Sequence, residues 1–126
     1  VIVDPRGTLT GGGGTVTANV INSGTMLPGA SAGLMTVNGD VALNDDSLLV
    51  IEIAGTAPGV AGGYDVLKVN GTLTRGGILQ IALVDGFLPD IGDTFKMREA
   101  EGFVGQFDDV LVPAVCDNTL ALQANL

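Results

Sequence analysis

The sequence contains no histidine and no tryptophan, and it has a single cysteine, Cys116. Without histidine, the Ser–His–acid and Cys–His arrangements of most hydrolases cannot be built, and neither can a histidine-ligated metal site. A single cysteine excludes an intrachain disulfide and a thiolate zinc cluster, so we interpret Cys116 as a small apolar side chain. These absences predict a protein that is not an enzyme.

Basic residues are also scarce. Five Lys and Arg residues face fourteen Asp and Glu residues, and the formal net charge is −9. A nucleic-acid-binding protein needs a positive patch that displaces counterions, so we expect neither nucleic acid nor an anionic membrane surface as a partner. No apolar run approaches the roughly 18 residues of a membrane-spanning helix. We therefore expect no membrane insertion.

Small and β-branched residues dominate instead. The chain has 20 glycines, and its apolar residues are mostly Val, Leu, Ile and Ala, which is typical of short strands joined by tight turns. In residues 15–20, apolar and polar side chains alternate strictly, as in a strand with one buried face. We predict an all-β chain of about ten to twelve short strands with little or no helix. Strand-like pieces that follow a glycine occur at residues 7–10, 14–17, 24–27, 39–42 and 71–74.

The chain is predicted to form a single all-β domain over residues 1–126, with two parts of different thickness. The Gly- and Thr-rich part, about residues 1–46, has no aromatic residue and looks like the rungs of a β-helix whose turn lengths vary. The part from about residue 47 to 126 contains all the phenylalanines and is expected to hold the thicker core. A β-helix and a β-sandwich both remain compatible with this pattern. The phenylalanines are Phe87, Phe95, Phe103 and Phe107.

The second part contains stronger individual strand signals. Residues 47–54 are apolar on both faces for most of their length, which predicts a central strand covered on both sides. Asn70-Gly71 predicts the tip of a two-residue hairpin. Further strands are predicted at residues 64–69, 78–84, 94–98, 107–112 and 119–124, and a loop is predicted at residues 55–63.

Acidic residues gather beside Gly, Asn and Pro. In that setting Asp commonly accepts hydrogen bonds from nearby backbone, so we interpret these acids as turn residues rather than as a catalytic pair. Calcium is the one metal whose ligand chemistry fits, through Asn44-Asp45-Asp46 or Asp108-Asp109, although neither segment matches a defined calcium loop. We therefore predict no cofactor. Asn70-Gly71-Thr72 also satisfies the N-glycosylation sequon, which leaves modification of Asn70 open.

Residues 23–40, SGTMLPGASAGLMTVNGD, resemble the passenger regions of bacterial autotransporter-like and other secreted β-helical surface proteins. The resemblance continues through residues 64–73, 77–79, 86–95 and 102–107. It implies a stacked, β-rich stalk on the outside of a bacterial cell. The sequence has no translocator barrel, no long array of rungs and no recognisable anchor, from which we expect a small subunit that assembles.

Two functions follow from this expectation. The first is a non-enzymatic extracellular structural protein that self-associates into a fibre or surface layer through strand edges. The second is a surface adhesin or glycan-binding module, for which Tyr64 is the obvious aromatic candidate, or a stalk fragment of a larger passenger protein. For the first function, the segment most suited to be donated to a neighbouring copy is Val1, Ile2, Val3, Asp4 and Pro5, although a frayed terminus would leave the same pattern.

Overall fold

The computed structural model describes residues 1–11, 13–29, 33–88 and 97–111. Every regular secondary-structure element in these residues is a strand, as the sequence predicts. No helix long and apolar enough to span a membrane is found among them. Cys116, Phe95, residues 94–96 and the predicted strand at 119–124 lie outside it. The strands are β1 (Ile2–Val3), β2 (Thr8–Thr10), β3 (Thr15–Val16), β4 (Val20–Asn22), β5 (Thr25–Leu27), β6 (Leu34–Val37), β7 (Val41–Leu43), β8 (Leu48–Ile53), β9 (Val66–Arg75), β10 (Ile78–Leu83), β11 (Arg98–Gly105) and β12 (Asp109–Leu111).

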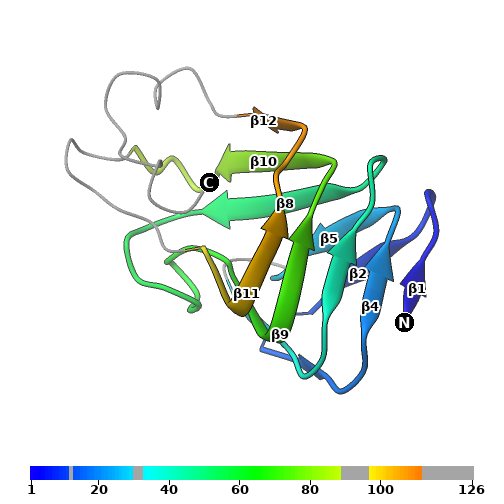
Figure 1. The fold of residues 1–126 in the computed structure, drawn as a ribbon. Coiled ribbons are helices and arrows are strands. Elements are labelled where there is room, and N and C mark those ends of the chain that lie inside the picture. The colour runs from blue at the N-terminus through cyan, green and yellow to red at the C-terminus, as the bar shows by residue number, and fades with distance from the viewer. Residues whose placement is uncertain (12, 30–32, 89–96, 112–126) are drawn as a thin grey trace.

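The described strands pair only in parallel ladders. One ladder runs β2, β5, β8, β10, β12, and another runs β1, β4, β7, β9 and then β11. A chain that returns repeatedly to the same sheet in the same direction must wind as a coil. The fold is therefore all-β and β-helix-like (Figure 1). The β-sandwich alternative, which is built from antiparallel sheets, does not describe this pairing.

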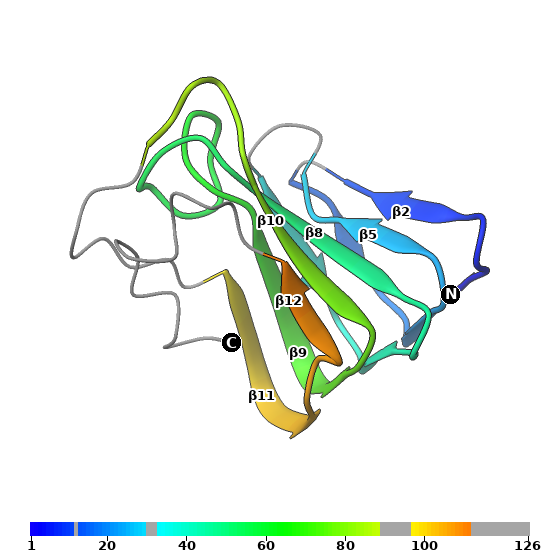
Figure 2. The same cartoon turned by 90° about the horizontal axis from the view of Figure 1, so that it is seen from above.

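Each coil contributes strands to three faces. The first face contains β1, β4, β7 and the second halves of β9 and β11. The second face contains β2, β5, β8, β10 and β12, which lie side by side in Figure 2. The third face contains β3, β6 and the first halves of β9 and β11.

The predicted hairpin at Asn70-Gly71 is wrong. Both residues lie inside β9, at the bend where this strand leaves the third face and enters the first. Gly71 lies against the preceding coil, where an added Cβ would be 2.5 Å from the carbonyl oxygen of Gly39. The glycine therefore permits close stacking of two corners rather than a reversal of the chain.

Side chains that point into the coil form stacked apolar rows. On the second face, Leu49 is paired with Met26 on one side and with Leu79 on the other, and all three are fully buried. Val37 and Val69 form a corresponding row on the third face. Burial of one such side chain stabilises the fold by about 1.5 to 3 kcal/mol, so these rows hold neighbouring coils together.

The phenylalanines contribute less to this core than the sequence suggests. The core is made of Val, Leu, Ile, Met and Tyr64, whereas Phe87 and Phe107 pack against its edge and Phe103 is 42% exposed. Equivalent inward side chains of neighbouring coils lie one strand spacing apart, about 4.8 Å. Aliphatic side chains are of a size that fills this distance.

The expectation that the strand predicted at residues 47–54 is covered on both sides is also wrong. In β8, Leu49, Ile51 and Ile53 are fully buried inside the coil, whereas the alternate side chains point outward and are half-buried. The usual rule for parallel sheets assumes helices on both faces, and this fold has none among its described residues.

Candidate functional site

The corner between the first and second faces alternates between protruding and recessed turns. Residues 4–7 and 44–47 form four-residue turns, closed by Gly7 N–H donating to Asp4 O (2.8 Å) and Ser47 N–H donating to Asn44 O (3.0 Å). Gly77, with φ +65°, is recessed beside the second turn, where an added Cβ would lie 2.8 Å from Asn44 O. This alternation creates a depression beside residues 44–46.

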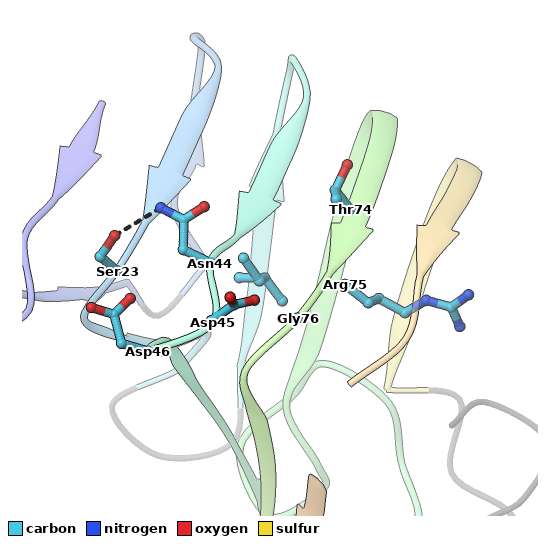
Figure 3. Close-up of a pocket in the computed structure, with 8 residues that line it drawn as sticks. Ser23, Asn44, Asp45, Asp46, Thr74, Arg75 and Gly76 are labelled. Carbon is cyan, nitrogen blue, oxygen red and sulfur yellow. Dashed lines mark hydrogen bonds between the residues drawn. The ribbon is translucent and has the colours of Figure 1, made fainter. Parts of the chain in front are cut away.

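The depression, which we call the corner recess, has a volume of about 630 Å³ and is the candidate site shown in Figure 3. Asn44 Nδ2 donates to Ser23 Oγ at 2.8 Å and so joins two successive coils. Arg75 extends away from the acids toward β11, where its Cζ lies 5.2 Å from the centre of the Phe103 ring. The recess is lined by Ser23, Leu43, Asn44, Asp45, Asp46, Thr74, Arg75 and Gly76.

The lining offers hydroxyl, amide and carboxylate groups that can hydrogen-bond a polar ligand. Among the described residues, no group of three or more His, Cys, Asp or Glu side chains is placed to hold a metal ion. At the other acidic pair, Asp108 Oδ2 accepts from Gly77 N–H (3.1 Å) and Asp109 Oδ1 accepts from Val110 N–H (2.8 Å). Both carboxylates therefore accept hydrogen bonds from backbone, Asp108 at a bend and Asp109 at the start of β12 rather than in a turn.

A ladder of polar side chains follows the corner between the third and first faces. Asn19 Oδ1 accepts from Asp40 N–H at 2.9 Å, and Asp40 Oδ1 in turn accepts from Thr72 N–H at 2.8 Å. Beside it, Asn70 Nδ2 donates to Asn38 Oδ1 at 2.6 Å. These hydrogen bonds each join one coil to the next. The Asn70 of the sequon is exposed, and its side chain is hydrogen-bonded to Asn38.

Asp65 is a buried carboxylate that sequence reasoning missed. Its Oδ1 accepts from Gly33 N–H (2.8 Å) and its Oδ2 from Glu52 N–H (2.9 Å), which ties together segments that precede β6 and end β8. Burial raises the pKa of Asp65 to about 6, against the lowering effect of the two backbone hydrogen bonds, and the nearby Glu52 charge also raises it. Glycines and a tyrosine flank Asp65 in the sequence, a setting that resembles the exposed turn acids.

Arg98 is a second buried charge, at the end of the described core. It is 4% exposed, and its Nε has no hydrogen-bond partner among the described residues. Its Cζ lies 5.1 Å from the Phe103 ring centre and 5.8 Å from that of Phe107. Burial lowers the pKa of Arg98 to about 10, and the neighbouring Arg75 charge lowers it further. Phe103 therefore makes cation–π contacts with both arginines, and Phe107 makes one with Arg98.

The residues singled out for assembly and for glycan binding do not line this recess, although Ser23, which does, donates its N–H to Val3 O at 2.8 Å. Ile2 and Val3 form β1 and pair with β4 of the same chain, and the N-terminal ammonium donates to Asn19 O at 2.7 Å. Ile2 is nevertheless 79% exposed. Tyr64 is only 4% exposed and belongs to the core, so it is not the surface platform that a glycan site would need.

Comparison with known proteins gives a partial match. Over 70 residues, 53% of this chain, the sequence is 41% identical to the Adhesin BmaC autotransporter of Brucella suis biovar 1 (strain 1330). The chain covers about 2% of the length of that protein. No family model matches the chain, and no solved structure matches it. The likeness loosely supports an autotransporter-like surface protein and suggests a surface or extracellular location and a non-enzymatic role.

Proposed function

We propose that this chain is a non-enzymatic structural module of a bacterial surface adhesin, in which its coils form part of a β-helical stalk. The observation that carries the proposal is the 41% identity to an autotransporter adhesin over 70 residues. The fold supports it because coils that contact only their neighbours form a rod that can be extended without changing its interior.

Surface labelling of bacteria that express the natural gene tests this proposal. An antibody raised against the purified chain is expected to label intact cells, with an antibody against a cytosolic protein as the control for lysis. Brief treatment of intact cells with protease should remove the label. Labelling that requires permeabilised cells would contradict a surface location.

A stalk is preferred over a glycan-binding module because the aromatic candidate, Tyr64, is buried. The corner recess is the polar alternative to that site, with Asp45, Asp46 and Thr74 as hydrogen-bonding groups. A glycan array probed with the purified chain separates the two functions. Hits that disappear in the Asp46→Ala variant would favour the binding module, and an array without hits favours the stalk.

A finer form of the proposal is self-association into a fibre through strand edges, with residues 1–5 as the segment that is donated to a neighbouring copy. Its support is the position of β1, which pairs with β4 along one edge. Electron microscopy of the purified chain should then show filaments. Deletion of residues 1–6 should abolish them while leaving a folded monomer, and filaments from the deletion variant would refute the role of this edge.

A further inference from the structure

The last coil of the described residues carries a charge on its inward side. Arg98 begins β11 and is paired with Leu67, which in turn is paired with Met35 of the coil before it. Leu67 and Met35 are buried, so Arg98 continues an inward row that is apolar in both preceding coils. It is itself 4% exposed, although the side chains of its row offer it no carboxylate. A permanently charged group therefore lies where the fold otherwise places apolar side chains.

Two aromatic rings compensate this charge only in part. The Arg98 Cζ lies 5.1 Å from the ring centre of Phe103 and 5.8 Å from that of Phe107. Burial and the neighbouring Arg75 charge both lower the pKa of Arg98, and no described carboxylate opposes them. The Arg98 Nε has no hydrogen-bond partner among the described residues, whereas buried charges in proteins are normally paired and hydrogen-bonded. The described coils therefore lack the anion that this cation requires.

The outer edge of β11 gives an anion access to this row. Among the described strands, β11 pairs with β9 alone and is the last strand of its ladder. In Figure 1 it stands beside β9 at one end of that row of strands. A parallel strand added at this edge would place one residue opposite Arg98, with its side chain pointing into the coil about 4.8 Å away. Asp or Glu at that position would lie within reach of the guanidinium.

We propose that β11 binds a parallel strand that carries Asp or Glu opposite Arg98, so that the two side chains form a buried ion pair. The residue of this strand opposite Phe103 is expected to be apolar, because Leu73, which is paired with Phe103 on the other side, is fully buried. The partner is thus an acidic β-strand segment of the kind that a further coil of a stalk supplies. In this respect the inference rests on the proposed function.

A second copy of this chain, stacked end to end, does not supply such a strand. Its first coil would then lie on β11. In that coil Thr15 is paired with Thr36, so the residue opposite Met35, in the row of Arg98, is Gly14. Glycine has no carboxylate, and an end-to-end copy would leave Arg98 unpaired. Charge complementarity therefore selects a strand of different sequence from the first coil.

Thermal unfolding of the purified chain tests whether Arg98 is unpaired. Arg98→Met keeps a long, unbranched side chain but removes the buried charge, and it should raise the melting temperature by about 5 °C. The matched control is Lys68→Met, which removes an exposed cation from β9 and should shift the melting temperature by no more than about 1 °C. An Arg98→Met chain whose melting temperature does not rise would overturn the proposal, because Arg98 would already be compensated.

Binding of two synthetic peptides tests the acidic strand. Both alternate Val and Thr, and one Val position is replaced by Glu in the first peptide and by Gln in the second. The Glu peptide should bind the wild-type chain about tenfold more tightly than the Gln peptide, measured by fluorescence anisotropy. This preference should disappear in Arg98→Met and persist in Lys68→Met.

Equal affinities of the wild-type chain for the two peptides would overturn the proposal. So would a preference for Glu that survives in Arg98→Met, or the absence of binding of either peptide up to about 1 mM. None of these outcomes bears on the labelling of intact cells, so the two proposals can fail separately.

Discussion

The first coil and the coils built on β8 and β10 are the same motif at two widths. The second-face strand has three residues in β2 but six in β8 and in β10. Hydrogen-bonded corner partners are 21 residues apart between Asn19 and Asp40, but 32 apart between Asp40 and Thr72. In the first coil Leu9 and Val16 are half-buried and Val3 is 7% exposed, whereas Leu49 in the wide coil is fully buried.

Burial in a coil therefore depends on its neighbours as much as on its own residues. An inward side chain is covered only if a coil stacks on each side of it. The free energy of unfolding of such a stack is close to the sum of the stabilities of the single coils and the interaction energies between adjacent coils. The narrow coil should therefore respond weakly to changes that severely damage the wide coils.

The largest effect is expected for truncation of a central side chain in the wide part. Leu49→Ala should cost about 4 kcal/mol of unfolding free energy, because a fully buried Leu leaves a cavity between two coils. The matched change Leu9→Ala in the first coil should cost about 1 kcal/mol. Urea unfolding of both variants measures the difference. Equal losses would show that the narrow coil is packed as tightly as the wide ones.

Glycine substitutions give the next largest contrast. Gly77→Ala should cost about 3 kcal/mol, since Gly77 has φ +65° and an added Cβ would lie 2.6 Å from Ser47 Oγ. Gly13 has φ +78° but nothing within 4 Å of an added Cβ, so Gly13→Ala should cost only about 1 kcal/mol. Thermal unfolding of the two variants is the measurement. A Gly77→Ala protein as stable as Gly13→Ala would mean that the corner relaxes freely.

The pH dependence of stability should come from the wide part. Because burial raises the pKa of Asp65 from 3.8 to about 6, the folded chain binds this proton more tightly than the unfolded chain. The contribution of Asp65 is therefore greatest below about pH 4 and declines by about 2 to 3 kcal/mol as pH rises through about 6.

Denaturant unfolding at intervals between pH 4 and 7 checks this decline. Asp65→Asn should flatten it, at a cost of about 1 to 3 kcal/mol from one poorly satisfied backbone N–H. Asp46→Asn, at an exposed position in the corner recess, is the control and should retain the wild-type slope. An unchanged slope in Asp65→Asn would assign the pH dependence to other carboxylates.

The smallest effect is expected at the exposed start of the narrow coil. Ile2 is 79% exposed, so Ile2→Thr should change stability by no more than about 0.5 kcal/mol. A loss comparable with that of Leu9→Ala would show that this side chain has a partner, and filament loss in the same variant would point to the proposed fibre edge.

Local sequence signals identified the strands more reliably than their pairing. The predicted strand at 78–84 is confirmed by β10, and the loop at 55–63 contains no strand. By contrast, β6 and most of β11 were not predicted as strands from the sequence. In residues 15–20 the alternation of burial is correct, but it spans a corner between β3 and β4 rather than one strand.

The candidate site was only partly visible from the sequence. Asn44-Asp45-Asp46 was recognised as an acidic turn, and it does line the corner recess. Thr74 and Arg75 join it from β9, which is a coil further along, and no local pattern could place them there. Asp65 and Arg98 were missed because a single charged residue looks the same in sequence whether it is exposed or buried.

The amino-acid sequence alone is enough to specify the all-β class of this protein. The absence of histidine removed most catalytic arrangements, and small, alternating residues with many glycines required short strands. Parallel pairing of the strands and the bend at Asn70-Gly71 within β9 are evident only in the folded chain. The physical reason is that alternation specifies which side chains share a face, whereas pairing depends on contacts between residues 21 to 32 positions apart.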